Sequence, residues 1–173
     1  AKELTIPREQ VLFRTKLTPT LDVAAQYFLE FRPNRLTEGG TFLGIGGGIY
    51  VDANRLLLAP GVFRARGDDI KPSPSGDYGV MLTWSPEILD GGAVGFYYRD
   101  TSESQPWLVI SPTNYHLAYA DNVKIYGLSL EGPIGPVSFG SEISFRKGTA
   151  LASSGLALPT DPRGTELARG NTL

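Results

Sequence analysis

The sequence predicts an all-β fold, namely part of an antiparallel, up-and-down transmembrane β-barrel with about six strands. Two observations predict it. Five segments of the chain alternate apolar and polar residues along nearly their whole length, and the connections between the segments alternate between short and long. Successive side chains of a β-strand point to opposite faces of the sheet, so this alternation is typical of strands with one apolar and one polar face. We therefore expect residues 1–173 to form a single partial barrel segment.

The expected strands follow one another along the chain. The five clear segments are 23–31, 78–84, 93–99, 123–131 and 137–146, and a weaker sixth precedes them at 11–17. Each of the five clear segments is about as long as a membrane-spanning β-strand. None of them has the convincing periodicity of an amphipathic helix. The sequence therefore predicts strands throughout.

Alternation also sorts the side chains of these segments onto two faces. One face is apolar and carries a single charge, Lys124, at the start of its segment, where a long side chain can reach lipid headgroups. The opposite face is polar and has room, because it includes Gly79, Gly95, Gly127 and Gly140. This division is expected of a barrel whose apolar face contacts lipid and whose polar face lines a lumen.

The connections favour a membrane barrel over a soluble fold. The short ones are 18–22, 85–92 and 132–136, and each contains Pro or Gly. The long ones are 32–77 and 100–122, followed by a loop-like C-terminal stretch at 148–173. Outer-membrane barrels alternate short periplasmic turns with long extracellular loops. Strands of a soluble barrel or sandwich also alternate, with the apolar face as core, so a soluble protein that binds an apolar ligand remains the alternative.

Composition excludes several classes of function. The net charge is −2 and there is no basic run, which argues against a nucleic-acid partner. The chain has no cysteine, so disulfides, thiolate metal sites and cysteine nucleophiles are absent. Clustered acidic residues lack the spacing of a calcium loop, so we expect neither a metal nor a cofactor.

The chain is expected to be a piece of a longer protein. No signal peptide is visible at its start. Six strands are also too few to close a membrane barrel, which needs at least about eight.

Four separated runs, at 24–44, 64–84, 92–106 and 124–148, together resemble a bacterial family catalogued as domain of unknown function 1302. The resemblance implies an outer-membrane β-barrel of Gram-negative bacteria, whose full members are longer than this chain. It also implies that members are encoded near a periplasmic lipoprotein-like partner and an inner-membrane exporter, which suggests traffic in lipids or other apolar molecules. The resemblance assigns no catalytic residue to this chain.

The candidate functional residues lie on the polar face and in the first long loop. The polar face carries charges of both signs, which favour neither an anion nor a cation funnel. These expected lumen-lining residues are Arg14, Lys16, Glu30, Arg99, Glu131, Glu142 and Arg146. The loop at 32–77 has apolar patches that a solvated loop does not need, so we expect local structure there. Its candidate contacts for an apolar cargo are Leu56, Leu57, Leu58 and Phe63.

A third hypothesis, a membrane-embedded hydrolase, depends on the one histidine, His116. It predicts His116 within hydrogen-bond reach of a serine. Because no nucleophile-elbow motif accompanies it, we expect a protein that is not an enzyme. The sequence thus predicts an outer-membrane channel or transporter component for small molecules, including apolar ones.

Overall fold

A computed structural model describes residues 6–34, 55–150 and 169–173. Its described part contains eleven β-strands and one short 3₁₀ turn, Glu87–Leu89. The strands are β1 (Gln10–Thr18), β2 (Leu21–Phe28), β3 (Arg55–Ala59), β4 (Val62–Arg66), β5 (Tyr78–Trp84), β6 (Ala93–Thr101), β7 (Trp107–Ile110), β8 (Asn114–Ala118), β9 (Val123–Ile134), β10 (Val137–Ala150) and β11 (Arg169–Thr172). The all-β prediction is confirmed.

Seven of these strands form one antiparallel sheet in the order β1-β2-β5-β6-β9-β10-β11. Six of them are the segments expected from alternation, and sequence neighbours in that set pair with each other, as in an up-and-down meander. The bounds shift by a few residues. In particular, β2 ends at Phe28, whereas alternation suggested a strand to Phe31.

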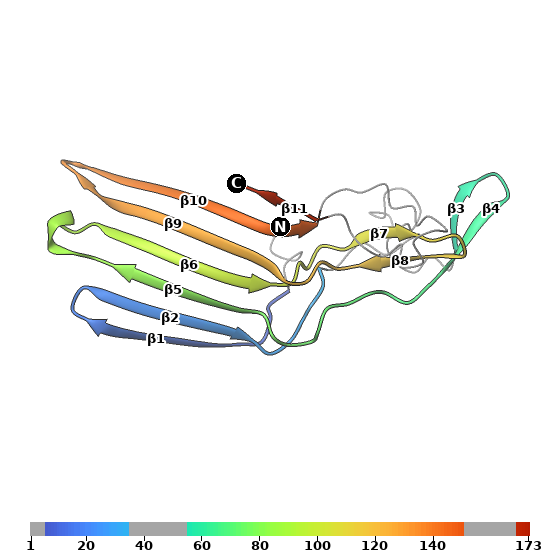
Figure 1. The fold of residues 1–173 in the computed structure, drawn as a ribbon, viewed down its shortest axis with the longest axis horizontal. Coiled ribbons are helices and arrows are strands. Elements are labelled where there is room, and N and C mark those ends of the chain that lie inside the picture. The colour runs from blue at the N-terminus through green and yellow to red at the C-terminus, as the bar shows by residue number, and fades with distance from the viewer. Residues whose placement is uncertain (1–5, 35–54, 151–168) are drawn as a thin grey trace.

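The two ends of this sheet differ in the length of their connections, as the sequence predicted. The short connections, β1 to β2, β5 to β6 and β9 to β10, all lie at one end, and the long connections lie at the other (Figure 1). Two glycines make the short turns possible. Gly135 has a φ of 61°, a left-handed conformation that costs glycine little. A Cβ atom on Gly92 would lie 2.7 Å from the carbonyl oxygen of Glu131. With any larger residue at position 92, the neighbouring strands could therefore not approach as closely as they do.

The long connections contain strands that the sequence pattern did not predict as such. The segment 32–77 carries the hairpin β3–β4, in agreement with the expected local structure, and the segment 100–122, expected to be a loop, carries the hairpin β7–β8. These four strands form a second sheet in the order β3-β4-β8-β7, in which β4 and β8 run parallel. We call this sheet the end lobe. Its strands are short and do not alternate as the longer ones do, which is why the pattern missed them.

The C-terminal stretch also differs from its expectation as a loop. Strand β10 continues to Ala150, and β11 pairs with it, so the sheet has seven strands rather than about six. The sequence of β11 has no apolar alternation, and its position depends on backbone pairing and on Arg169, which donates a hydrogen bond to the Asp121 carboxylate at 2.7 Å. Residues 151–168 of this stretch and 35–54 of the first long connection lie outside the described residues.

The buried core lies where the end lobe meets the long-connection end of the sheet. Tyr115 and Val123 are fully buried. A cluster of small apolar side chains packs there beside Trp107, and it consists of Val109, Ala118, Ala120, Val123 and Ala150. The end lobe continues beyond the end of the seven-stranded sheet and does not cover it (Figure 1). Within the described part of the chain, this sheet is therefore a single layer.

Candidate functional site

The two faces of the seven-stranded sheet are sorted as alternation predicted. Leu82 of β5 lies opposite Val23 of β2 and Phe96 of β6, and Phe96 lies opposite Leu128 of β9. Each pairing joins residues of the apolar face, so the face continues across strands. Its large side chains are exposed, including Val11, Phe13, Tyr27, Val80, Trp84, Phe96, Tyr126, Leu128, Val137, Phe139 and Ile143.

An aromatic row crosses this apolar face near its long-connection end. The rings of Tyr78 and Tyr98 are 5.9 Å apart, those of Tyr98 and Tyr126 are 5.1 Å apart, and Phe145 follows at 6.4 Å. Lys124 lies on this face just beyond the row, nearer the long connections, and is opposite Asp100 of β6 in the strand register. The face therefore changes from charged to aromatic to aliphatic along the strands.

The opposite face holds the expected lumen-lining charges. Arg14, Lys16, Glu131, Glu142 and Arg146 are all exposed on strands of the sheet. Arg99 lies half-buried on β6, on the same face. Glu30 does not lie on a strand, because β2 ends before it.

Ion pairs among these charges are few in the described part of the chain. Arg14 pairs with Asp22 at 3.3 Å across the β1–β2 hairpin. Glu142 accepts a hydrogen bond from the Tyr97 hydroxyl, which reaches it across β9. The Tyr97 ring lies over Gly127, where an added Cβ would come within 1.8 Å of it. Gly127 thus accommodates a large side chain of the neighbouring strand.

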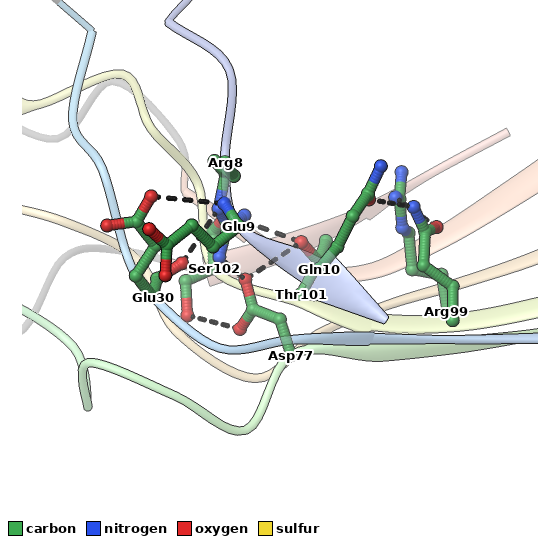
Figure 2. Close-up of polar contacts among 9 residues, drawn as sticks. Arg8, Glu9, Gln10, Glu30, Asp77, Arg99, Thr101 and Ser102 are labelled. Carbon is green, nitrogen blue, oxygen red and sulfur yellow. Dashed lines mark hydrogen bonds and ion pairs between the residues drawn. The ribbon is translucent and has the colours of Figure 1, made fainter. Parts of the chain in front are cut away.

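A polar network lies at the long-connection end of the polar face (Figure 2). The sequence pattern did not predict it. The Arg8 guanidinium donates to the Asp77 carboxylate at 2.7 Å. The hydroxyl groups of Ser102 and Thr101 donate to the same carboxylate at 2.9 and 3.3 Å. Arg8 precedes the first strand, so alternation gave no signal for it. The network joins the N-terminal segment to the ends of β5 and β6.

The protonation of Asp77 follows from these contacts. Burial opposes its charge, but hydrogen bonds from Ser102 and the ion pair with Arg8 outweigh burial, so the pKa of Asp77 lies below its usual value. Beside it, Glu30 accepts a hydrogen bond from the Glu9 backbone at 3.0 Å and pairs with Arg32 at 2.7 Å. Both contacts lower the pKa of Glu30, and the hydrogen bond from the Glu9 backbone has the larger effect.

Two guanidinium groups flank a buried aromatic ring next to this network. Phe28 is buried, and the guanidinium carbons of Arg8 and Arg99 lie 4.4 and 5.0 Å from its ring centre. Arg99 also donates to the Gln26 side chain at 3.0 Å, and Gln26 in turn contacts Gln10. Cation–π contacts of this kind contribute about 0.5–2 kcal/mol each. They hold both arginines at the edge of the polar face.

The sequence of this sheet and its connections matches a family model described as "Protein of unknown function (DUF1302)", over residues 1–172. The chain belongs to the DUF1302 family. The family resemblance noted from the four sequence runs is thereby confirmed. No curated protein and no solved structure matches the chain.

The cargo-contact residues expected in this DUF1302 chain lie apart from the polar face. They belong to the β3–β4 hairpin, at the end of the lobe farthest from the sheet (Figure 1). Leu56 is buried, whereas Leu58 and Phe63 are exposed, and the Arg55 guanidinium lies 4.8 Å from the Phe63 ring centre. Leu57 pairs with Phe63 in the hairpin, and its side chain lies outside the described part. The structure does not bring these residues together with the charges of the polar face.

His116 is buried in the end lobe on β8. Its Nε2 atom has no hydrogen-bond partner among residues 6–34, 55–150 and 169–173, so no serine of these ranges is bound to this atom in the way that the hydrolase hypothesis would require. Across that same part of the chain, no group of three or more His, Asp or Glu side chains is placed to hold a metal. No helix among the described residues is long and apolar enough to cross a membrane.

Burial of His116 predicts that acid weakens the end lobe. Burial lowers its pKa, with a smaller opposing effect of Asp69. The unfolded chain therefore binds the proton more readily than the folded chain, and stability falls as the pH drops below about 6.5. We expect amide-exchange protection of β8, corrected for intrinsic rates, to decrease from pH 7.5 to 5. His116→Gln, which does not titrate, should flatten this decrease, and an unchanged slope would contradict the assignment.

Proposed function

We propose that this chain forms part of the wall of an outer-membrane β-barrel in a Gram-negative bacterium, and that the barrel passes small molecules, including apolar ones. The observation that carries the proposal is a single-layer antiparallel sheet with a continuous, exposed apolar face and a charged opposite face. Soluble monomers rarely expose apolar patches larger than a few hundred Å². Lipid is the surrounding that this face fits.

The length of the apolar band supports a membrane. On β10 the band runs over residues 137–145, a stretch within the roughly 9–11 residues that a tilted membrane strand needs. Its long-connection end carries the aromatic row, with Lys124 and Asp100 beyond it. Aromatic girdles mark the interfaces of such barrels, and charged side chains there reach headgroups at little cost.

The lining fits a wet path rather than a catalytic centre. Its exposed charges have both signs, so the path discriminates weakly between anions and cations. The proposal assigns no reaction to the chain. Closure requires the outer strands β1 and β11 to pair with further strands, since membrane barrels have at least about eight. As partners we propose outer-membrane lipid and, in line with the family resemblance, a periplasmic lipoprotein-like protein and an inner-membrane exporter.

The soluble alternative requires a second layer that buries the apolar face. The described part of the chain offers one candidate for it, the end lobe, and the lobe extends the sheet lengthwise (Figure 1). The geometry therefore supports the membrane proposal better.

The two tryptophans provide a direct test of lipid contact. Trp84 lies on the apolar face and is 46% exposed, whereas Trp107 packs against the core of the end lobe. We expect the chain to gain β-structure only with detergent or lipid and to shift in gel migration on boiling. Each single substitution leaves one tryptophan to observe. In vesicles of brominated lipid, the Trp107→Phe variant should show strong quenching of Trp84 fluorescence. The Trp84→Phe variant should show only weak quenching of Trp107 fluorescence. A folded, monodisperse chain in plain buffer, or equal quenching of both residues, would overturn the proposal.

A further inference from the structure

The polar face is not uniformly polar, because a depression in it has an apolar floor. The depression has a volume of about 250 Å³ and is open to one side. Its floor and walls on this face are Leu12, Ala24, Gln26, Met81, Tyr97 and Arg99. Ligand pockets usually span about 300–1,000 Å³. A site of this size suits one alkyl chain better than a bulky ring system.

The rigid parts of the depression are fixed by packing. Tyr97 lies over Gly127 and donates to Glu142, so its ring stays flat against the sheet. The stem of Arg99 lies along Gly79, where an added Cβ would be 3.6 Å from Cγ of Arg99. The apolar surface and the guanidinium therefore lie side by side on neighbouring strands.

Among the described residues, no carboxylate lies within ion-pair distance of the cation at this end of the depression. Arg8 is paired with Asp77, and the other carboxylate nearby, Glu30, is paired with Arg32. Arg99 contacts Gln26 and the Phe28 ring and forms no ion pair within the described residues 6–34, 55–150 and 169–173. A half-buried cation beside apolar side chains is complementary to an anion that carries an apolar tail.

We propose that this depression binds a single-chain amphiphile with a carboxylate head, the head on Arg99 and the chain over Leu12, Ala24 and Met81. The guanidinium supplies charge-assisted hydrogen bonds to the carboxylate, and the apolar floor shields the chain from water. The proposal deepens the proposed function and rests on it in one respect, namely that the polar face lines the path. It assigns Arg99 the role of selecting the head group of the cargo.

A unique probe lies in the floor of the site, because Met81 is the one methionine in the sequence. Labelling with ¹³C-methyl methionine gives a single methyl resonance for Met81 in the folded chain, and Met81→Leu identifies it. We expect decanoate, added to the chain in nonionic micelles, to shift this resonance saturably. Decanol has the same chain length without the charge and should bind more weakly.

Substitution of Arg99 isolates the contribution of the head group. Arg99→Gln should weaken decanoate binding about tenfold or more, the effect of losing a charge-assisted hydrogen bond, and should leave decanol binding within about twofold. Because each ligand is compared between variants, its partition into micelles cancels. Arg14→Gln removes an exposed charge from the same face and should change neither affinity. Arg99→Lys keeps the charge and should fall between the wild type and Arg99→Gln, which preserves the test if the glutamine variant does not fold.

The outcomes separate this inference from the proposed function. A Met81 resonance that decanoate does not shift, or a shift that Arg99→Gln leaves unchanged, would overturn the binding site while the Trp84 quenching result still stands. A saturable, Arg99-dependent shift in a chain that fails the quenching test would support the site and remove the membrane setting.

Discussion

We expect Leu82→Lys to destabilise the folded chain in a bilayer by about 2–4 kcal/mol, and Thr83→Lys to change its stability by less than about 1 kcal/mol. The two residues are neighbours on β5 and point to opposite faces of the sheet. Leu82 lies in the middle of the apolar face between Val23 and Phe96. In the proposed barrel, a lysine at this position enters the hydrocarbon of the membrane. Thr83 lies opposite Asp22 on the polar face, where a lysine stays among polar and charged side chains.

The measurement is urea unfolding from lipid vesicles, followed by tryptophan fluorescence. Val137→Lys is the control for depth, because Val137 lies on the apolar face beside the short turn. The cost of a lysine in a bilayer falls to about 0–1 kcal/mol near the interface, so Val137→Lys should resemble Thr83→Lys. Equal destabilisation by Leu82→Lys and Thr83→Lys would contradict the assignment of the faces.

Alternation predicted the sheet well because side-chain period and strand register follow the same rule. Once Leu82 is placed opposite Phe96, every other pair between β5 and β6 is fixed, and the apolar face follows. The positions of Arg14, Glu131, Glu142 and Arg146 on the polar face were predictable for the same reason. The family resemblance added the membership that the comparison confirms.

The end lobe was not predictable in this way, since its strands are short and β8, which pairs with both β4 and β7, is almost wholly buried. In β8, Tyr115, His116 and Leu117 are all buried, so no alternation of polarity marks the strand. A short apolar run of this kind does not distinguish a buried strand from other buried structure. The hairpin β7–β8 inside the long connection 100–122 was not predicted for this reason.

The polar network and the depression depend on contacts between distant segments. Arg8 and Asp77 are separated by 69 positions in the sequence, and Arg99 and Gln26 by 73. No local pattern signals such pairs. Sequence reasoning placed Arg99 on the polar face, but its contact with Phe28 and its position beside Met81 required the fold.

Asp77→Asn is expected to destabilise the fold by about 2–3 kcal/mol, which is less than the roughly 3–5 kcal/mol for removing one partner of a fully buried ion pair. The side chains of Arg8 and Asp77 are only 16% and 11% exposed. The amide keeps an oxygen for Ser102 but leaves the Arg8 guanidinium without its counter-charge. Asp22→Asn is the matched control, because the Arg14 side chain is 69% exposed and exposed pairs contribute about 0–1 kcal/mol.

The same substitution has a signature in pH. Because the pKa of Asp77 is lower in the folded chain than in the unfolded chain, its contribution to stability is complete above the unfolded value, about 3.9, and is lost as the pH falls through the lower folded value. Below about pH 4, the free energy of unfolding of the wild type should therefore fall more steeply than that of Asp77→Asn. The difference in unfolding free energy between the two proteins should narrow accordingly. Urea midpoints measured from pH 7 to 2.5 test this. A difference that stays constant over the whole range would show that Asp77 contributes through packing rather than through its charge, and that Arg8 does not depend on it as a counter-ion.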